Sequence, residues 1–240
     1  MTGSYVPFLK VVGSTLARSS EILVRHSFGR LSPQAVDAIF ARWAQSVFAA
    51  GNGTVEGFGL EHIQPGQAYV VMTNHQSLLD IPAVMLTFPG RIRMVGKKEL
   101  ANVPIWGGAM RAAGNVFVSR DGGRDQARAS LEGAKARLRE GASVWIAPEG
   151  TRSRDGNLQR FKKGGFHVAM QLGVPLLPGF VDGTREVIAP DSFRVRPGGH
   201  VTVRYGAPIA TDGVDDAGIP ALMEQVRQAL EGLRAAGDRP

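Results

Sequence analysis

The sequence contains no cysteine, which excludes disulfide bonds, thiolate zinc sites and a cysteine nucleophile and fits a reducing compartment. No run of 18 or more apolar residues occurs, so a membrane-spanning helix is not expected. The first 12 residues also lack the basic start, apolar run and small-residue cleavage pattern of a signal peptide. These absences favour a folded enzyme or binding protein that does not cross a membrane.

Aromatic residues are scarce at 7%, although the formal net charge is +7. Lysine and arginine are scattered along the chain and do not form one block, so a basic groove studded with aromatic rings is not indicated. We therefore do not expect a nucleic-acid partner. Anionic lipid, a phosphorylated substrate and a nucleotide-bearing donor all remain compatible with this charge.

The segment 5–50 predicts two helices separated by a break at 28–33. Ser32 is a suitable N-cap, and Pro33 suits the first position of the second helix. Two interpretations stay open for this pair of helices. They either pack on the core like ordinary helices, or they form an interfacial anchor that lies on a bilayer, with basic residues reaching lipid headgroups.

After residue 50 the pattern alternates between short apolar strands and helices. The expected strands are 53–59, 68–73, 92–95, 115–118, 143–147, 175–181 and 200–205, and the expected helices are 77–87, 98–113, 124–140, 161–172 and 215–235. This alternation predicts an α/β fold, with a mostly parallel central sheet flanked by helices and preceded by the two-helix segment. We expect a membrane-associating segment at 1–50 and an α/β domain at 51–240.

Three polar clusters directly follow expected strands, at 74–80, 119–121 and 148–153. In such sheets, functional residues gather at the carboxyl ends of the strands. The sequence therefore predicts a single site built from these three clusters.

His75 and Asp80 are the first candidates for catalysis. On one ideal helix, an offset of five residues would place their side chains roughly 140° apart. Pro82 instead indicates that Asp80 lies in the first turn of a helix, which lets it converge with a histidine that precedes the helix. Such a carboxylate would fix the imidazole tautomer and leave the other ring nitrogen to act as a general base. The alternative is a histidine at a helix start beside an ordinary first-turn acid.

No serine lies in the Gly-x-Ser-x-Gly context of an α/β-hydrolase nucleophile. With no cysteine either, a His–Asp pair favours direct attack by a substrate hydroxyl, without an acyl-enzyme.

Several residues near the strand ends are suited to binding an anion. Gly150 allows close backbone approach, and Arg152 and Arg120 can make paired contacts with phosphate oxygens. Lys97 adds charge, although a lysine there is also an ordinary surface residue. Glu149 either contacts a substrate or holds one of the arginines in an ion pair.

Four segments in order resemble the motifs of the lysophosphatidate (1-acylglycerol-3-phosphate) O-acyltransferase family, the His-x4-Asp glycerolipid acyltransferases. They are Asn-His-Gln-Ser-Leu-Leu-Asp at 74–80, Gly-Asn-Val-Phe-Val-Ser-Arg at 114–120, Glu-Gly-Thr-Arg-Ser at 149–153 and Val-Pro-Leu-Leu-Pro at 174–178. The resemblance covers about residues 53–209.

This resemblance implies an acyl thioester donor, either acyl-CoA or acyl carrier protein, and no metal or other cofactor. It implies that His75 deprotonates the acceptor hydroxyl and that Asp80 orients His75. The substrate-binding residues it implies are Arg120, Glu149, Gly150, Thr151, Arg152, Lys97 and Ser77. Because some members carry a two-helix anchor, it also favours a peripheral or monotopic protein on the cytoplasmic face of the membrane.

The leading functional hypothesis is acylation of 1-acylglycerol 3-phosphate to phosphatidate. Ser119 departs from the family pattern, which often has an acid before the arginine, so a lyso-ornithine lipid or a glycolipid is an alternative acceptor. A non-catalytic lipid- or CoA-binding protein is the alternative from a different class.

Overall fold

The computed structural model of the chain describes residues 3–118 and 124–237, without the side chains of 124–130. Its centre is one sheet in the order β1-β7-β6-β2-β5-β3-β4. The strands are β1 (Thr54–Phe58), β2 (Val70–Thr73), β3 (Ile92–Lys97), β4 (Val116–Val118), β5 (Ser143–Ile146), β6 (Leu176–Asp182) and β7 (His200–Tyr205). Only the β6–β7 pair is antiparallel, and every other neighbouring pair is parallel. The predicted mostly parallel sheet is therefore confirmed.

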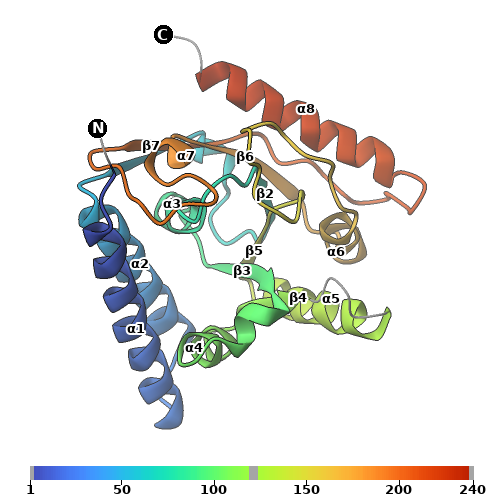
Figure 1. The fold of residues 1–240 in the computed structure, drawn as a ribbon. Helices are drawn as coiled ribbons and strands as arrows, with labels where there is room; N and C mark the ends of the chain where they lie inside the picture. The colour runs from blue at the N-terminus through green and yellow to red at the C-terminus, as the bar shows by residue number, and fades with distance from the viewer. Residues whose placement is uncertain (1–2, 119–123, 238–240) are drawn as a thin grey trace.

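Helices cover both faces of this sheet (Figure 1). They are α1 (Val6–Ser27), α2 (Pro33–Ala50), α3 (Asp80–Thr87), α4 (Trp106–Ala112), α5 (Arg124–Arg139), α6 (Gly164–Leu172), α7 (Thr184–Val187) and α8 (Ile219–Gly237). Two short 3-10 helices, η1 (Leu60–His62) and η2 (Lys98–Asn102), lie in connections.

The buried side chains form three hydrophobic cores, one of them between α1, α2 and α4. The other two lie on opposite faces of the sheet because alternate strand residues point to opposite faces. On β2, Val71 belongs to the core beneath α2 and α3, whereas Val70 and Met72 belong to the core beneath α5, α6 and α8. All four residues of β2 are buried, as expected for a central parallel strand covered on both faces.

The two N-terminal helices form as predicted. The Ser32 hydroxyl accepts a hydrogen bond from the Ala35 backbone N–H at 3.1 Å, and Pro33 occupies the first helical position. The Trp43 indole N–H of α2 donates to the Thr15 hydroxyl of α1 at 2.9 Å. The pair also packs on the rest of the fold, since α1 contacts α4 and α2 contacts α3. Across residues 3–118 and 124–237, no helix combines the length and apolarity needed to cross a membrane.

Four of the expected helices differ from the structure, and those expected to begin at residues 161 and 215 begin at Gly164 and Ile219. The helix expected to begin at Ser77 begins at Asp80, because the Asp80 carboxylate binds the preceding turn. The helix expected over 98–113 is divided into η2 and α4 around Pro104, next to Ile105 with φ +64°. Proline lacks the backbone N–H that a continuous helix would use at this point.

Candidate active site

The catalytic candidates lie where β2 and β5 end, and these two strands are parallel neighbours. The chain leaving β2 reaches His75, and the chain leaving β5 reaches Glu149. The backbone N–H of His75 donates to Glu149 Oε1 at 3.1 Å, and the backbone N–H of Ser153 donates to the backbone carbonyl of His75 at 2.7 Å. The structure thus brings together the polar clusters 74–80 and 148–153, as their positions after parallel strands predicted.

The Asp80 side chain organises the turn that contains His75. Asp80 Oδ2 lies 2.7 Å from His75 Nδ1 and accepts the N–H groups of Gln76 at 2.7 Å and Ser77 at 2.9 Å. The hydroxyl of Thr184 donates to Asp80 Oδ1 at 2.6 Å. A carboxylate, which only accepts hydrogen bonds, matches this set of donors. The arrangement therefore places the imidazole proton on Nδ1.

The other imidazole nitrogen, Nε2 of His75, has no hydrogen-bond partner among the described residues and so remains able to accept a proton. The His75 side chain is 18% exposed, which gives a substrate access to it. Trp145 of β5 packs its ring edge-on against the imidazole, with centroids 5.5 Å apart, and its indole N–H donates to Thr73 at 3.0 Å. This geometry would allow the imidazole to accept a proton at Nε2, as a general base does.

Glu149 connects the two polar clusters through backbone amides. Its two oxygens accept from the His75 N–H and, at 2.8 Å, from the Gln159 N–H. The residue is only 2% exposed, and this burial raises the pKa of its carboxyl group above the usual value, against the opposing effect of the two amides. Within the described part of the chain Glu149 makes no ion pair with Arg152, which was one of its expected roles.

The loop after Glu149 presents backbone and positive charge beside the histidine. Gly150 has φ +70°, a conformation that favours glycine, and the side chain of Lys162 passes over the position where a Cβ would stand. Thr151 is exposed and Arg152 is partly exposed. Neither side chain has a hydrogen-bond or ion-pair partner among the described residues. These two side chains are therefore free to contact an anion.

The Asp155 side chain stabilises the later part of this loop, at residues 153–157. Its carboxylate accepts from the Asn157 backbone N–H, the Asn157 side chain and the Ser153 hydroxyl. These bonds, with the backbone N–H of Asn157 as the largest cause, lower the pKa of the Asp155 carboxyl to about 2. These hydrogen bonds to Asp155 stabilise the turn that places the backbone N–H of Gln159 within bonding distance of Glu149.

The remaining predicted site residues occupy different positions. Lys97 is exposed at the end of β3, one strand beyond β5. Ser77 is fully buried, and its hydroxyl donates to the Ile188 carbonyl at 2.8 Å, so it holds the turn against the segment after β6. Arg120 and Ser119 lie outside the described residues.

Three supporting residues were not predicted from the sequence. Asn74 exchanges two hydrogen bonds with the Val181 backbone of β6, at 2.7 and 2.8 Å, and the Gln76 amide donates to the same carbonyl at 2.9 Å. Thr184 completes the shell around Asp80. The polar residues that flank His75 indicated a specific turn, but nothing near Thr184 in the sequence indicated its long-range partner.

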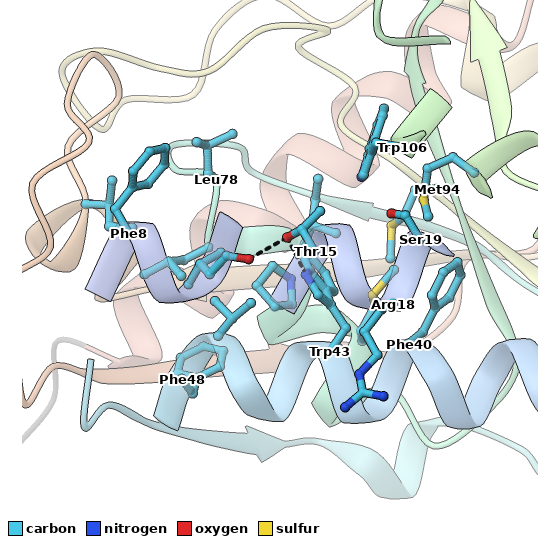
Figure 2. A pocket seen from close by; sticks show the side chains of 18 of the residues that line it. Phe8, Thr15, Arg18, Ser19, Phe40, Trp43, Phe48, Leu78, Met94 and Trp106 are labelled. Atoms are coloured by element: carbon cyan, nitrogen blue, oxygen red, sulfur yellow. Dashed lines mark hydrogen bonds between the residues drawn. The ribbon is translucent and has the colours of Figure 1, made fainter. Parts of the chain in front are cut away.

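An apolar cavity of about 820 Å³ begins beside the turn at residues 74–80, which we call the catalytic turn. Leu78 and Leu79 of that turn form part of its wall, together with side chains of α1, α2 and β3 (Figure 2). Polar groups in the wall are few, and one of them, the Thr15 hydroxyl, accepts from Trp43 and donates to the Val11 carbonyl at 2.8 Å. A cavity of this size and composition suits a hydrocarbon ligand.

Replacing Glu149 with glutamine tests its connecting role. The amide must present an NH₂ group to one of the two backbone N–H donors, so one hydrogen bond becomes a donor–donor contact. We expect kcat of any reaction that uses His75 to fall by about tenfold or more, which corresponds to ~1.4 kcal/mol. Steady-state kinetics would measure this, with Glu61→Gln, at an exposed glutamate of η1, as the control. An unchanged kcat in Glu149→Gln would contradict the role.

The comparisons with known proteins agree with this site. The model of the family described as Acyltransferase matches residues 54–182, a range that contains the His75–Asp80 turn and the Glu149 loop. The 1-acyl-sn-glycerol-3-phosphate acyltransferase alpha of Mus musculus is 35% identical over 176 residues, 73% of this chain and 62% of that protein. The 1-acyl-sn-glycerol-3-phosphate acyltransferase of Saccharomyces cerevisiae is 34% identical over 178 residues, 72% of this chain and 57% of that protein.

A solved structure extends the likeness to the N-terminal helices. The crystal structure of the 1-acyl-sn-glycerophosphate (LPA) acyltransferase PlsC from Thermotoga maritima has a TM-score of 0.80 and 25% sequence identity. It covers 98% of this chain and 95% of that chain, although this chain spans only about three fifths of the length of the mouse relative. From the matching family model and the identity to these relatives, we conclude that the chain belongs to the acyltransferase family.

Proposed function

We propose that this protein transfers a fatty acyl group from an acyl thioester to the free hydroxyl of 1-acylglycerol 3-phosphate, which yields phosphatidate. The observation that carries the proposal is the His75–Asp80 pair. Nε2 of His75 has no hydrogen-bond partner among the described residues, the His75 backbone is bonded to the Glu149 loop, and the same turn contributes Leu78 and Leu79 to the wall of the apolar cavity. The names of the similar mouse and yeast proteins support the same acceptor.

In the proposed reaction, His75 Nε2 removes the proton from the acceptor hydroxyl as its oxygen attacks the thioester carbonyl carbon. The carbon–oxygen bond forms, the tetrahedral intermediate collapses and the carbon–sulfur bond breaks. The imidazolium then returns its proton to the departing thiolate, so His75 ends as it began. Asp80 holds the ring and stabilises the imidazolium during this exchange. The donor is acyl-CoA or acyl carrier protein, and the proposed steps use no resident cofactor.

The acceptor phosphate has a suitable place in this scheme. The Lys162 side chain lies over Gly150, Arg152 follows two residues later in the same loop, and Lys97 stands at the end of β3. We propose that these cations and the adjacent backbone bind the phosphate, with Arg120 contributing from the segment after β4. Such contacts would place the acceptor hydroxyl next to His75.

A donor-by-acceptor activity matrix tests the proposal. Acyl-CoA and acyl carrier protein donors are each combined with lysophosphatidate, with a phosphate-free lysolipid and with lyso-ornithine lipid, and thiol release is measured. We expect lysophosphatidate to give the highest kcat/KM. Turnover with a phosphate-free lysolipid and none with lysophosphatidate would exclude the proposed acceptor, and binding without any turnover would favour the non-catalytic alternative.

We also propose that α1 seats the enzyme peripherally on the cytoplasmic face of the membrane. Large apolar side chains of α1 are exposed along one stripe, including Leu9 at 65%, Val12 and Leu16. The opposite side of the helix faces α2 and the cavity. Lys10 and Arg25 add positive charge for anionic headgroups.

Charged substitutions on this stripe test the seating. Placing aspartate at Leu9, Val12 and Leu16 together should lower binding to phosphatidylglycerol vesicles by more than tenfold. Each change removes apolar surface that would be buried in the bilayer and adds a negative charge that the anionic headgroups repel. Co-sedimentation measures the effect, and Leu60→Asp, at a 39% exposed leucine outside the N-terminal helices, serves as the control. Equal binding by both proteins would place the membrane contact elsewhere. Deletion of 1–50 is less suitable, because Ile22, Ile39 and Phe40 belong to the core.

A further inference from the structure

The C-terminal helix α8 lies outside the residues that the family model matches, yet one of its side chains reaches the loop between β5 and α6. Nη2 of Arg227 donates to the backbone carbonyl of Gln159 at 2.8 Å. The same guanidinium lies over the Phe161 ring, with its carbon 4.4 Å from the ring centre. Figure 1 shows this loop passing close to α8 before the chain enters α6. Arg227 therefore contacts the 159–162 segment at two points.

This segment runs beside the residues that leave β5. The backbone N–H of Gln159 donates to Glu149 Oε2 at 2.8 Å, and the backbone N–H of Lys162 donates to the Pro148 carbonyl at 2.8 Å. The Lys162 side chain then crosses Gly150, with its Nζ 3.3 Å from where a Cβ of Gly150 would stand. The position of the segment therefore decides where the Lys162 ammonium stands and how one oxygen of Glu149 is held.

The helix that carries Arg227 is held in place by other residues. Ile219, Leu222, Val226 and Leu230 of α8 are all buried in the core that this helix shares with α6 and β6. The Arg227 side chain lies at the edge of this core and is 27% exposed. Because four buried apolar side chains fix the helix, loss of the guanidinium should leave α8 folded and packed.

Arginine is suited to making both contacts at once. Its planar guanidinium can donate in its plane while its face lies on an aromatic ring, whereas a lysine ammonium is a single point of charge. The Phe161 ring is 5% exposed and stacks on Phe166 of α6, so it offers a fixed surface. The ion pair of Arg227 with Glu231 is 4.0 Å long and exposed, and it contributes little. The carbonyl and the ring are therefore the main partners of Arg227.

We propose that Arg227 is a positioning residue for the acceptor, because it fixes the 159–162 segment so that Lys162 reaches the acceptor phosphate. The inference rests on the proposed function, in which Lys162 is one of the cations that bind this phosphate. Arg227 acts through Lys162, and the C-terminal helix thereby takes part in acceptor binding from outside the residues that the family model matches.

Replacing Arg227 with glutamine tests this role, and Arg234→Gln is the matched control, since it removes the same charge from an exposed position of the same helix. The KM for lysophosphatidate and the KM for the acyl donor are measured separately. We expect Arg227→Gln to raise the KM for lysophosphatidate about tenfold and to leave the KM for the donor unchanged. The kcat should change less, because the bond between Glu149 and the His75 backbone remains. Arg234→Gln should change none of these values.

The conservative variant Arg227→Lys separates geometry from charge. It keeps the positive charge but cannot make both contacts, so its KM for lysophosphatidate should be close to that of Arg227→Gln. A wild-type KM in Arg227→Lys would show that only the charge of α8 matters and would overturn the proposal. An unchanged KM for lysophosphatidate in Arg227→Gln would overturn it as well.

A double-mutant cycle shows whether Arg227 acts through Lys162. Lys162→Gln alone should raise the KM for lysophosphatidate, because it removes one of the proposed phosphate contacts. Adding Arg227→Gln to Lys162→Gln should then raise this KM no further, since no ammonium is left to be positioned. If Arg227→Gln raised the KM by the same factor with and without Lys162, the two residues would act independently and the proposal would be wrong.

Backbone hydrogen exchange tests the positioning without any turnover. Exchange in peptides that cover residues 157–163 is measured by mass spectrometry in the absence of substrate. We expect faster exchange in Arg227→Gln and not in Arg234→Gln, because the N–H groups of Gln159 and Lys162 lose protection when the segment loosens. If the wild type did not acylate lysophosphatidate, this difference would still support the positioning while the proposed function failed. Equal exchange in the wild type and Arg227→Gln would overturn the positioning, whatever the substrate.

Discussion

Replacing His75 with alanine is expected to lower kcat by about 100- to 10,000-fold, the usual contribution of a positioned general base. The structure gives the reason, since Nε2 of His75 has no partner among the described residues while Nδ1 is bonded to Asp80. Without the imidazole, the two carboxylates at the turn, of Asp80 and Glu149, already accept hydrogen bonds from the protein and are poor substitutes for the base. Thiol release from the acyl donor, followed in single-turnover experiments, measures the chemical step directly.

The same variant should keep its binding of lysophosphatidate and of vesicles, because the His75 ring belongs neither to the proposed phosphate site nor to the exposed stripe of α1. His200→Ala is the matched control, since His200 is exposed near Glu56 on the outer strand pair β1–β7. An unchanged rate in His75→Ala would remove the proposed mechanism. Unchanged lipid binding with lost turnover would show that His75 is needed for catalysis and is not needed for lipid binding.

Replacing Asp80 with asparagine should have an effect of similar size, about 100- to 10,000-fold on kcat. The carboxylate accepts from His75 Nδ1, from two backbone N–H groups and from Thr184. An asparagine can keep only part of this set, because its NH₂ group cannot accept. If its amide turns NH₂ towards Nδ1, the imidazole proton moves to Nε2 and the base is lost.

The Thr184→Val variant tests how far the position of the Asp80 carboxylate matters while its negative charge is kept. It removes only the hydroxyl donor to Asp80 Oδ1 and leaves the Oδ2 contacts in place, so we expect a smaller loss, about tenfold. The pH profile of kcat/KM supplies the second readout, because a change confined to folding would lower activity without moving the profile. A kcat for Asp80→Asn within threefold of the wild-type value would contradict the orienting role.

Local patterns in the sequence were enough to predict that His75 meets Asp80 and to predict most of the fold. Pro82 placed Asp80 in a first helical turn, and this is where the helix begins. The positions of His75 and Glu149 after buried strands predicted their meeting, because parallel neighbours share an edge. The two N-terminal helices followed from Ser32 and their apolar spacing.

The remaining features depend on partners that are distant in the sequence. Thr184 reaches Asp80 across 104 positions, and Asn74 reaches Val181 across 107, so no local pattern could reveal either bond. The antiparallel pairing of β7 with β6 likewise depends on how the chain returns after α7. Glu149 was a candidate for an ion pair, and its bonds to backbone amides became visible only when the loop closed on Gln159.

The hydrogen bonds of the catalytic turn have a consequence for how substrates are exchanged. The turn is hydrogen-bonded to β6 through the Asn74 side chain and to the loop after β5 through the Glu149 carboxylate. The Ser77 hydroxyl bonds it to the segment after α7. Opening it would break several buried bonds together, at a cost of about 1 to 3 kcal/mol for each polar group left unsatisfied. We therefore expect the turn at residues 74–80 to keep one conformation through the catalytic cycle, so that substrates enter and leave without opening it.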